Sequence, residues 1–221
     1  MPIPAFHGLF SCRALARCSA AALACALSMP LAAQPAQPSP PANTAKPDTQ
    51  TMESYRKAAT NGDADAMNSL GVMYENGQGV AQSNTQAVQW FRKAANKDYA
   101  AAMSNLGLMY ANGQGVAQSD TQAIKWFRKA ADKDNAAAMY SLGVMYAYGK
   151  GVTQSDTQAV EWYRKAAAKD YAAAMYNLGV MYANGQGVAQ SDAQAIEWYG
   201  KAARAGHEKA KNLLRKMGLS W

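Results

Sequence analysis

Apolar residues recur along this chain with the spacing of helices. Ala66, Leu70, Met73 and Tyr74 fall at i, i+4, i+7 and i+8, which places them on one side of a helix. The pattern predicts a helix over about residues 64–76 that has one apolar face.

A second apolar set follows a glycine-containing stretch. Ser83 and Gln86 precede it as Ser-x-x-Gln, a capping box that starts a helix. Gly77 suits the left-handed residue that ends the first helix, and Gly79 permits the turn that follows. The two stretches are therefore predicted to form an antiparallel helix pair. The second set has the same helical spacing and comprises Ala87, Val88, Trp90, Phe91, Ala94 and Ala95.

This two-helix pattern returns at a constant step of 36 residues. Gly71, Gly107, Gly143 and Gly179 hold the same position in four copies. They lie at the margin of the apolar face, where a missing Cβ lets the paired helix approach closely. A period of this length is typical of a stack of identical helix pairs, so the sequence predicts an all-α solenoid.

The repeats divide the solenoid, expected over residues 51–221, into six segments. Arg215 stands where the full repeats have glycine, so the last helix should cap the array without receiving another pair. The segments are a half-repeat at 52–65, full repeats at 66–101, 102–137, 138–173 and 174–209, and a terminal capping helix at 209–218.

The start of the chain resembles a secretory signal. Residues 1–33 contain two arginines and then an apolar stretch that is shorter than a membrane span. Cleavage after Ala33 is expected, with lipid anchoring at Cys25 as the less favoured alternative. Residues 34–50 hold five prolines and no large apolar side chain, and we expect an extended, disordered linker there. These features predict a periplasmic or secreted protein.

The repeated phrase Ala-Met-x-x-Leu-Gly-x-Met-Tyr-x-x-Gly-x-Gly-Val, followed by Ala-[Val/Ile]-x-Trp-[Phe/Tyr]-x-Lys-Ala-Ala, resembles the Sel-1-like repeat family. This family is related to tetratricopeptide repeats, and the resemblance covers residues 52–217. It implies a right-handed α/α superhelical solenoid whose first helices line a concave face, with a role as an adaptor or scaffold in protein complexes. Some cysteine-rich relatives are described as weakly penicillin-binding or β-lactamase-like. This chain lacks their cysteines, because its own three all lie within residues 1–33.

Side chains suited to catalysis or ligand binding are sparse. No metal, nucleophile or cofactor constellation is recognisable, so we expect no enzymatic activity and no cofactor. Ser54 and Lys57 match the Ser-x-x-Lys motif of penicillin-recognising enzymes, but the accompanying Ser-Asp-Asn and Lys-Thr-Gly motifs are missing. His207 is expected at the surface. The recurring tryptophans are expected in the core; they are Trp90, Trp126, Trp162 and Trp198.

The charge of the chain is mildly positive. After residue 33 it has 20 basic and 15 acidic residues, a net charge of +5, which is smaller than nucleic-acid binding normally requires. Basic pairs such as Arg92-Lys93 recur near the ends of the second helices, where they complement the helix dipole and are expected to face solvent. A weak contact of this basic outer face with an anionic envelope surface is one alternative function.

The face of the first helices opposite the core is the best candidate binding surface, because it varies between repeats while the framework does not. It changes from polar and acidic at the N-terminal end to aromatic in the third and fourth repeats, and aromatic side chains are favoured at interfaces. The candidate partner-binding residues are Asn68, Val72, Glu75, Asn76, Ser104, Leu108, Asn112, Tyr140, Val144, Tyr148, Tyr176, Val180 and Asn184.

From these features we expect a monomeric, non-enzymatic, exported scaffold that holds a protein or peptide segment on this concave face. Two alternatives remain. One is a weak penicillin-binding or β-lactamase-like hydrolase, and the other is a cell-surface or host-contact module that uses the basic outer face.

Overall fold

The computed structural model describes residues 49–221, which form helices joined by short turns. Over this range it contains no strand, as the all-α prediction requires. The helices are α2 (Thr49–Thr60), α3 (Ala64–Asn76), α4 (Asn84–Ala95), α5 (Ala100–Asn112), α6 (Asp120–Ala131), α7 (Ala136–Tyr148), α8 (Asp156–Ala167), α9 (Ala172–Asn184), α10 (Asp192–Arg204) and α11 (Glu208–Lys216).

The helix predicted over residues 64–76 is α3, with the same bounds. The linker expected over residues 34–50 overlaps α2, which already begins at Thr49. The expected signal segment and the rest of the linker lie outside the described residues.

Each helix pair is held together by contact between a glycine and an aromatic ring. A Cβ built on Gly71 would lie 2.4 Å from Cε1 of Phe91, and one on Gly107 would lie 2.5 Å from Cε1 of Phe127. Both rings are fully buried. Carbon atoms normally stay about 3.5–4.0 Å apart, so any larger residue would push the two helices apart. The prediction that these glycines serve close packing is confirmed.

The turns between the helices also follow the prediction. Gly77 ends α3 with a φ of 67°, in the left-handed region, and Ser83 accepts a hydrogen bond from the backbone N–H of Gln86 at the start of α4. The capping box is only half formed, however, because the N–H of Ser83 donates to the carbonyl oxygen of Tyr74. This bond ties the end of the turn back to the preceding helix.

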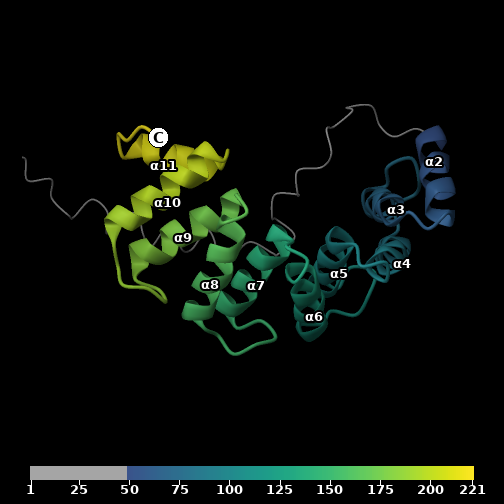
Figure 1. Cartoon of the computed structure of the whole chain (residues 1–221), viewed down its shortest axis with the longest axis horizontal. Helices are drawn as coiled ribbons and strands as arrows, with labels where there is room; N and C mark the ends of the chain where they lie inside the picture. The colour runs from purple at the N-terminus through teal and green to yellow at the C-terminus, as the bar shows by residue number, and fades with distance from the viewer. Residues whose placement is uncertain (1–48) are drawn as a thin grey trace, which may run out of the picture.

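Successive pairs stack into a bent array (Figure 1), and α2 and α11 lie at its two ends. The first helices α5 and α7 contact each other directly, as expected where the inner side of the bend brings neighbouring repeats together. We call the surface formed by the non-core positions of α3, α5, α7 and α9 the inner face, and the exposed surface of α4, α6, α8 and α10 the outer face.

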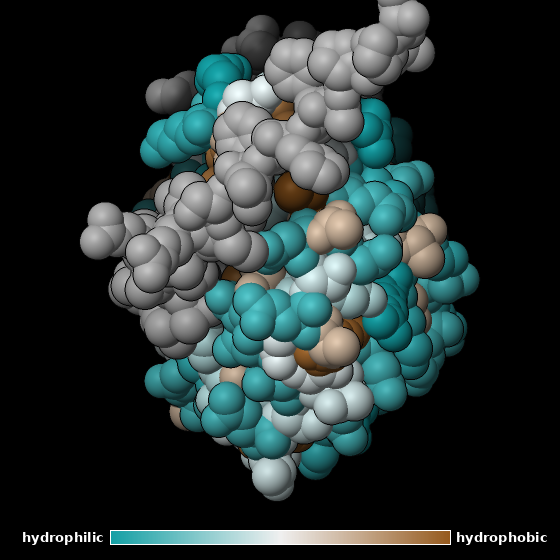
Figure 2. All heavy atoms as spheres, turned by 90° about the vertical axis from the view of Figure 1, so that its left-hand side faces the viewer, coloured by the Kyte–Doolittle hydropathy of each residue, from teal (hydrophilic) through white to brown (hydrophobic). Residues whose placement is uncertain are grey.

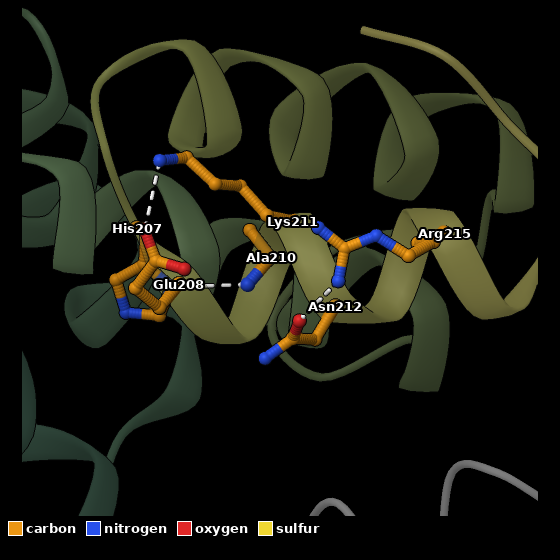
Figure 3. A network of polar contacts seen from close by, with 6 residues as sticks. All are labelled: His207, Glu208, Ala210, Lys211, Asn212 and Arg215. Carbon is orange, nitrogen blue, oxygen red and sulfur yellow. Dashed lines mark hydrogen bonds and ion pairs between the residues drawn. The ribbon is translucent and has the colours of Figure 1, made fainter.

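The C-terminal helix α11 covers the last repeat with Ala210 and Leu214, which are buried. Its outer surface is polar: Lys211 contacts Glu208, and Arg215 donates a hydrogen bond to Asn212 (Figure 3). The C-terminal end of the array, seen face on in Figure 2, is mainly hydrophilic where described residues are visible. The predicted capping helix at 209–218 corresponds to α11 at Glu208–Lys216, which has a buried apolar side and a polar outer side.

Candidate functional site

The inner face is nearly free of charge. The sequences of α5, α7 and α9 contain no Asp, Glu, Lys or Arg, whereas each second helix carries several. Charged side chains on the inner face are confined to α3, where Asp65 and Glu75 lie at opposite ends. The inner face thus offers amides, hydroxyls and apolar groups over three repeats, with carboxylates only at its N-terminal end.

The predicted site residues differ widely in accessibility. Tyr148 and Asn76 are exposed, and the others, apart from Ser104 and Val144, are half-buried. Tyr148 is 39% exposed, and among the described residues the only other exposed large apolar side chains are Leu219 and Trp221. The half-buried members are Asn68, Val72, Glu75, Leu108, Asn112, Tyr140, Tyr176, Val180 and Asn184.

Ser104 and Val144 were wrongly assigned to the binding surface. Ser104 is 2% exposed and Val144 is 8% exposed, so neither side chain can form much contact with a partner. Val144 lies one helical turn from both Tyr140 and Tyr148, whose longer side chains project from the same side of α7.

Tyr140 is part of an aromatic cluster instead of standing free. Its ring centroid lies 5.7 Å from that of Tyr163 and 5.2 Å from that of Tyr171, and its hydroxyl accepts a hydrogen bond of 3.4 Å from the Asn177 amide. Burial, with a smaller effect of Tyr171, raises the pKa of Tyr140 to about 12. The phenol is therefore neutral at physiological pH.

Tyr176 forms a second cluster one repeat further on. Its ring packs 5.5 Å from Tyr199 and stacks on His207 at 4.5 Å with an interplanar angle of 20°. His207 also starts α11, because its Nδ1 accepts the backbone N–H of Ala210 (Figure 3). His207, expected at the surface, is half-buried. Burial lowers the pKa of His207, and Lys209 adds to this effect.

The N-terminal end of the inner face is acidic and polar. The hydroxyl of Tyr99 donates to Asp65; burial and this bond raise the pKa of Tyr99 to about 12. Burial also raises the pKa of the Glu75 carboxyl. Further along, the Asn105 amide donates to Asn68 at 3.0 Å. Side-chain hydrogen bonds between repeats therefore line this part of the face.

The outer face carries a ladder of cation–π pairs that sequence reasoning did not find. The Lys93 ammonium lies 3.9 Å from the ring centroid of Trp90, and the next repeat pairs Lys129 with Trp126 at 4.5 Å. The tryptophans were expected in the core. They are instead half-buried and pack against the core from outside. The remaining pairs are Lys165–Trp162 and Lys201–Trp198.

A second unpredicted contact links α2, α4, α6 and α8 each to the first helix that follows. Arg128 Nη2 donates to the hydroxyl of Tyr146 at 2.9 Å. The sequence contained an indication of this contact, because the arginine and the tyrosine are lost together. The last copy has Gly200 in place of the arginine and Gly218 in place of the tyrosine. The basic ladder therefore joins repeats and does not simply face solvent. The equivalent pairs are Arg56–Tyr74, Arg92–Tyr110 and Arg164–Tyr182.

Other candidate sites gain little support. The hydroxyl of Ser54 donates to the Thr51 carbonyl at 2.7 Å within α2, as an ordinary helical serine does. Over residues 49–221 there is no group of three metal-ligating side chains, and none of the helices in this range has the length and apolarity to cross a bilayer. A shallow hollow between the first two repeats is lined by Trp126, Lys129 and Lys133 among others.

The repeat geometry agrees with comparisons to known proteins. A model of the Sel1 repeat matches residues 64–99, 100–135, 136–171 and 172–207. The chain belongs to the Sel1 repeat family. Proteins of this family generally act as protein-interaction scaffolds and are generally not enzymes. The matched repeats start two residues before the division proposed from the sequence, at the first residue of each first helix.

Solved structures show the same architecture. A protective antigen of uropathogenic Escherichia coli, c5321, is 40% identical with a TM-score of 0.71; the match covers 78% of this chain but only 38% of the antigen. A Sel1 repeat protein from Oxalobacter formigenes is 32% identical with a TM-score of 0.68, covering 75% of this chain and 74% of that protein.

A third structure is an immunity protein of Pseudomonas aeruginosa, Pa5087. It is 25% identical with a TM-score of 0.56, and the match covers 90% of this chain and 67% of that protein. No curated protein matches the chain.

Proposed function

We propose that this Sel1 repeat protein is a non-enzymatic scaffold that binds an extended peptide or protein segment along the inner face. The uncharged first helices α5, α7 and α9 carry the proposal. Asparagine amides both donate and accept hydrogen bonds, which suits the backbone of an extended peptide, and tyrosine supplies rigid contact area at interfaces. A phosphate backbone would find no cation on these helices.

Tyr148 is the anchor of the proposed site. Its ring is exposed, and it lies at the C-terminal end of α7, in the position that Asn76, Asn112 and Asn184 hold in the other repeats. Tyr140 on α7 and Tyr176 on α9 are held by neighbouring aromatic side chains. A partner would therefore meet one free aromatic side chain on a preformed surface, which keeps the entropic cost of binding low.

The test uses a substitution that the array already tolerates. Peptides selected from a random library on the wild-type protein are measured against the Tyr148→Asn variant, which gives α7 the C-terminal residue of its sister helices. We expect at least a tenfold loss of affinity, since a buried aromatic anchor contributes about 1.5–3 kcal/mol. The matched control is Lys125→Gln on the outer face, where the first repeat has Gln89; this variant should bind like wild type. Equal binding by all three proteins would refute the site.

We also propose that the protein is monomeric and is exported through residues 1–33. Support comes from the sequence of that segment, with its two arginines, short apolar stretch and Ala32-Ala33 end. Fractionation of cells followed by N-terminal sequencing tests the export. A periplasmic or extracellular protein that starts at Gln34 is expected, whereas a cytoplasmic protein that starts at Met1 would contradict it. Light scattering tests the oligomeric state.

A further inference from the structure

The segment that precedes the array has a composition that matches the inner face. Residues 34–47 read Gln-Pro-Ala-Gln-Pro-Ser-Pro-Pro-Ala-Asn-Thr-Ala-Lys-Pro, with five prolines and a single charge, on Lys46. Proline-rich segments bind to surfaces lined by aromatic side chains, because their polyproline II conformation is preformed and little entropy is lost on binding. The inner face has the exposed Tyr148 and, on the same helix, Tyr140, whose ring packs on Tyr171.

The point where this segment joins the array favours an intramolecular contact. The short turn Asn61-Gly62-Asp63 joins α2 to α3, and the two helices pack against each other. The start of α2 at Thr49 therefore lies near the C-terminal end of α3, where Glu75 and Asn76 are found. Tyr148 occupies the same end of α7, so the segment enters at the edge of the stack that carries the exposed tyrosine.

The length of the segment is sufficient to reach this tyrosine. Fourteen residues in a polyproline II conformation extend about 43 Å at ~3.1 Å per residue. Packed helices are about 8–10 Å apart, so the two steps from α3 to α7 require a distance on the order of 20 Å. The charge also fits, because Lys46 is three residues before the start of α2 in the sequence, and the carboxylates of the inner face, Asp65 and Glu75, are both on α3.

We propose that residues 34–47 bind to the inner face of their own chain, with Lys46 near Glu75 and the prolines against Tyr148, so that the segment competes with external partners. This inference rests on the proposed function, since it uses the same surface. The segment would weaken the apparent affinity of external partners, because a tethered competitor is present at an effective concentration of about millimolar.

The experiment compares the chain from residue 34 with the chain from residue 48, which keeps every residue that the structure describes. A fluorescein-labelled peptide of residues 34–47 is titrated with each protein, and binding is followed by fluorescence anisotropy. We expect the shorter protein to bind the peptide and the longer one to bind it at least fivefold more weakly. In the shorter protein, Tyr148→Asn should weaken binding while Lys125→Gln should not, and a peptide with all five prolines replaced by alanine should bind poorly.

The outcomes separate this inference from the proposed function. Equal binding of the labelled peptide to both proteins, or to neither, would overturn the intramolecular contact. The proposed function would survive that result if library-selected peptides still bound in a manner that depends on Tyr148. If those selected peptides also bound equally to wild type and Tyr148→Asn, both proposals would fail. Circular dichroism of each variant verifies that the helices are intact.

Discussion

Replacing a glycine by alanine should have opposite effects at two helical positions of this array. Gly107 lies in α5 and Gly200 in α10. At Gly107 a Cβ would lie 2.5 Å from Cε1 of Phe127, whereas at Gly200 the nearest atom is the flexible Arg204 Nη1 at 3.6 Å. Alanine is favoured over glycine in a helix by about 1 kcal/mol, so Gly200→Ala should stabilise the protein by roughly that amount.

For Gly107→Ala the steric cost exceeds the gain in propensity. The overlap with Phe127 is about 1 Å relative to normal carbon contacts, and this ring is fully buried, so it cannot rotate into solvent. Overpacking of a core costs about 1–3 kcal/mol. We expect a cost at the upper end of this range, because the added methyl group separates α5 from α6. After the propensity gain, the free energy of unfolding should fall by about 2 kcal/mol.

Urea unfolding followed by circular dichroism measures both changes. The double variant Gly107→Ala/Phe127→Leu provides the internal control, because removing the ring edge should make the alanine less costly than it is beside phenylalanine. A Gly107→Ala protein that is as stable as Gly200→Ala would refute the close-packing explanation. So would the absence of coupling between positions 107 and 127.

Three further predictions concern the turns and the contacts between repeats. Asp170 has a φ of 58° and Asp134 a φ of 63°, but only Asp134 forms an ion pair, with Lys169 at 2.9 Å. Asp170→Gly should therefore stabilise the protein by about 0.5 kcal/mol, because it relieves left-handed strain. Asp134→Gly should stabilise it less, since this change also removes the ion pair. The opposite order of thermal unfolding temperatures would contradict this explanation. Because burial lowers the pKa of His207 in the folded state, its contribution to stability is present above pH 6.5 and is lost as the pH falls below that value. His207→Asn should remove this part of the pH dependence of the urea midpoint. Tyr146→Phe deletes the acceptor of Arg128 and should cost about 0.5–1 kcal/mol in the same urea assay.

The framework of the fold could be predicted because each of its requirements repeats four times. Gly71 and its copies, the left-handed Gly77 and the Ser83 cap each have one local physical cause, and the structure shows that cause in each case. The linkage between repeats was harder to find, because a pair such as Arg128 and Tyr146 is separated by 18 residues. Only the simultaneous loss of both partners at Gly200 and Gly218 indicated it.

The candidate site was predicted less well, because a helical wheel shows one helix without its neighbours. Ser104 and Val144 lie on the side of the helical wheel opposite the predicted core, but both are buried. Tyr140 and Tyr176 were predicted as partner-binding residues, yet their rings pack on Tyr171 and His207, the residues that precede α9 and α11. Only the three-dimensional stacking of repeats distinguishes these side chains from Tyr148, which remains exposed.

Photo-crosslinking in living cells would test the central claim most directly, because it reports which face of the array meets a partner. The photoreactive residue p-benzoylphenylalanine replaces Tyr148 on the inner face or, in a separate strain, the exposed Lys125 on the outer face. A scaffold that binds through its first helices should form a discrete protein adduct from position 148 and none from position 125. An adduct from position 125 alone would contradict the claim.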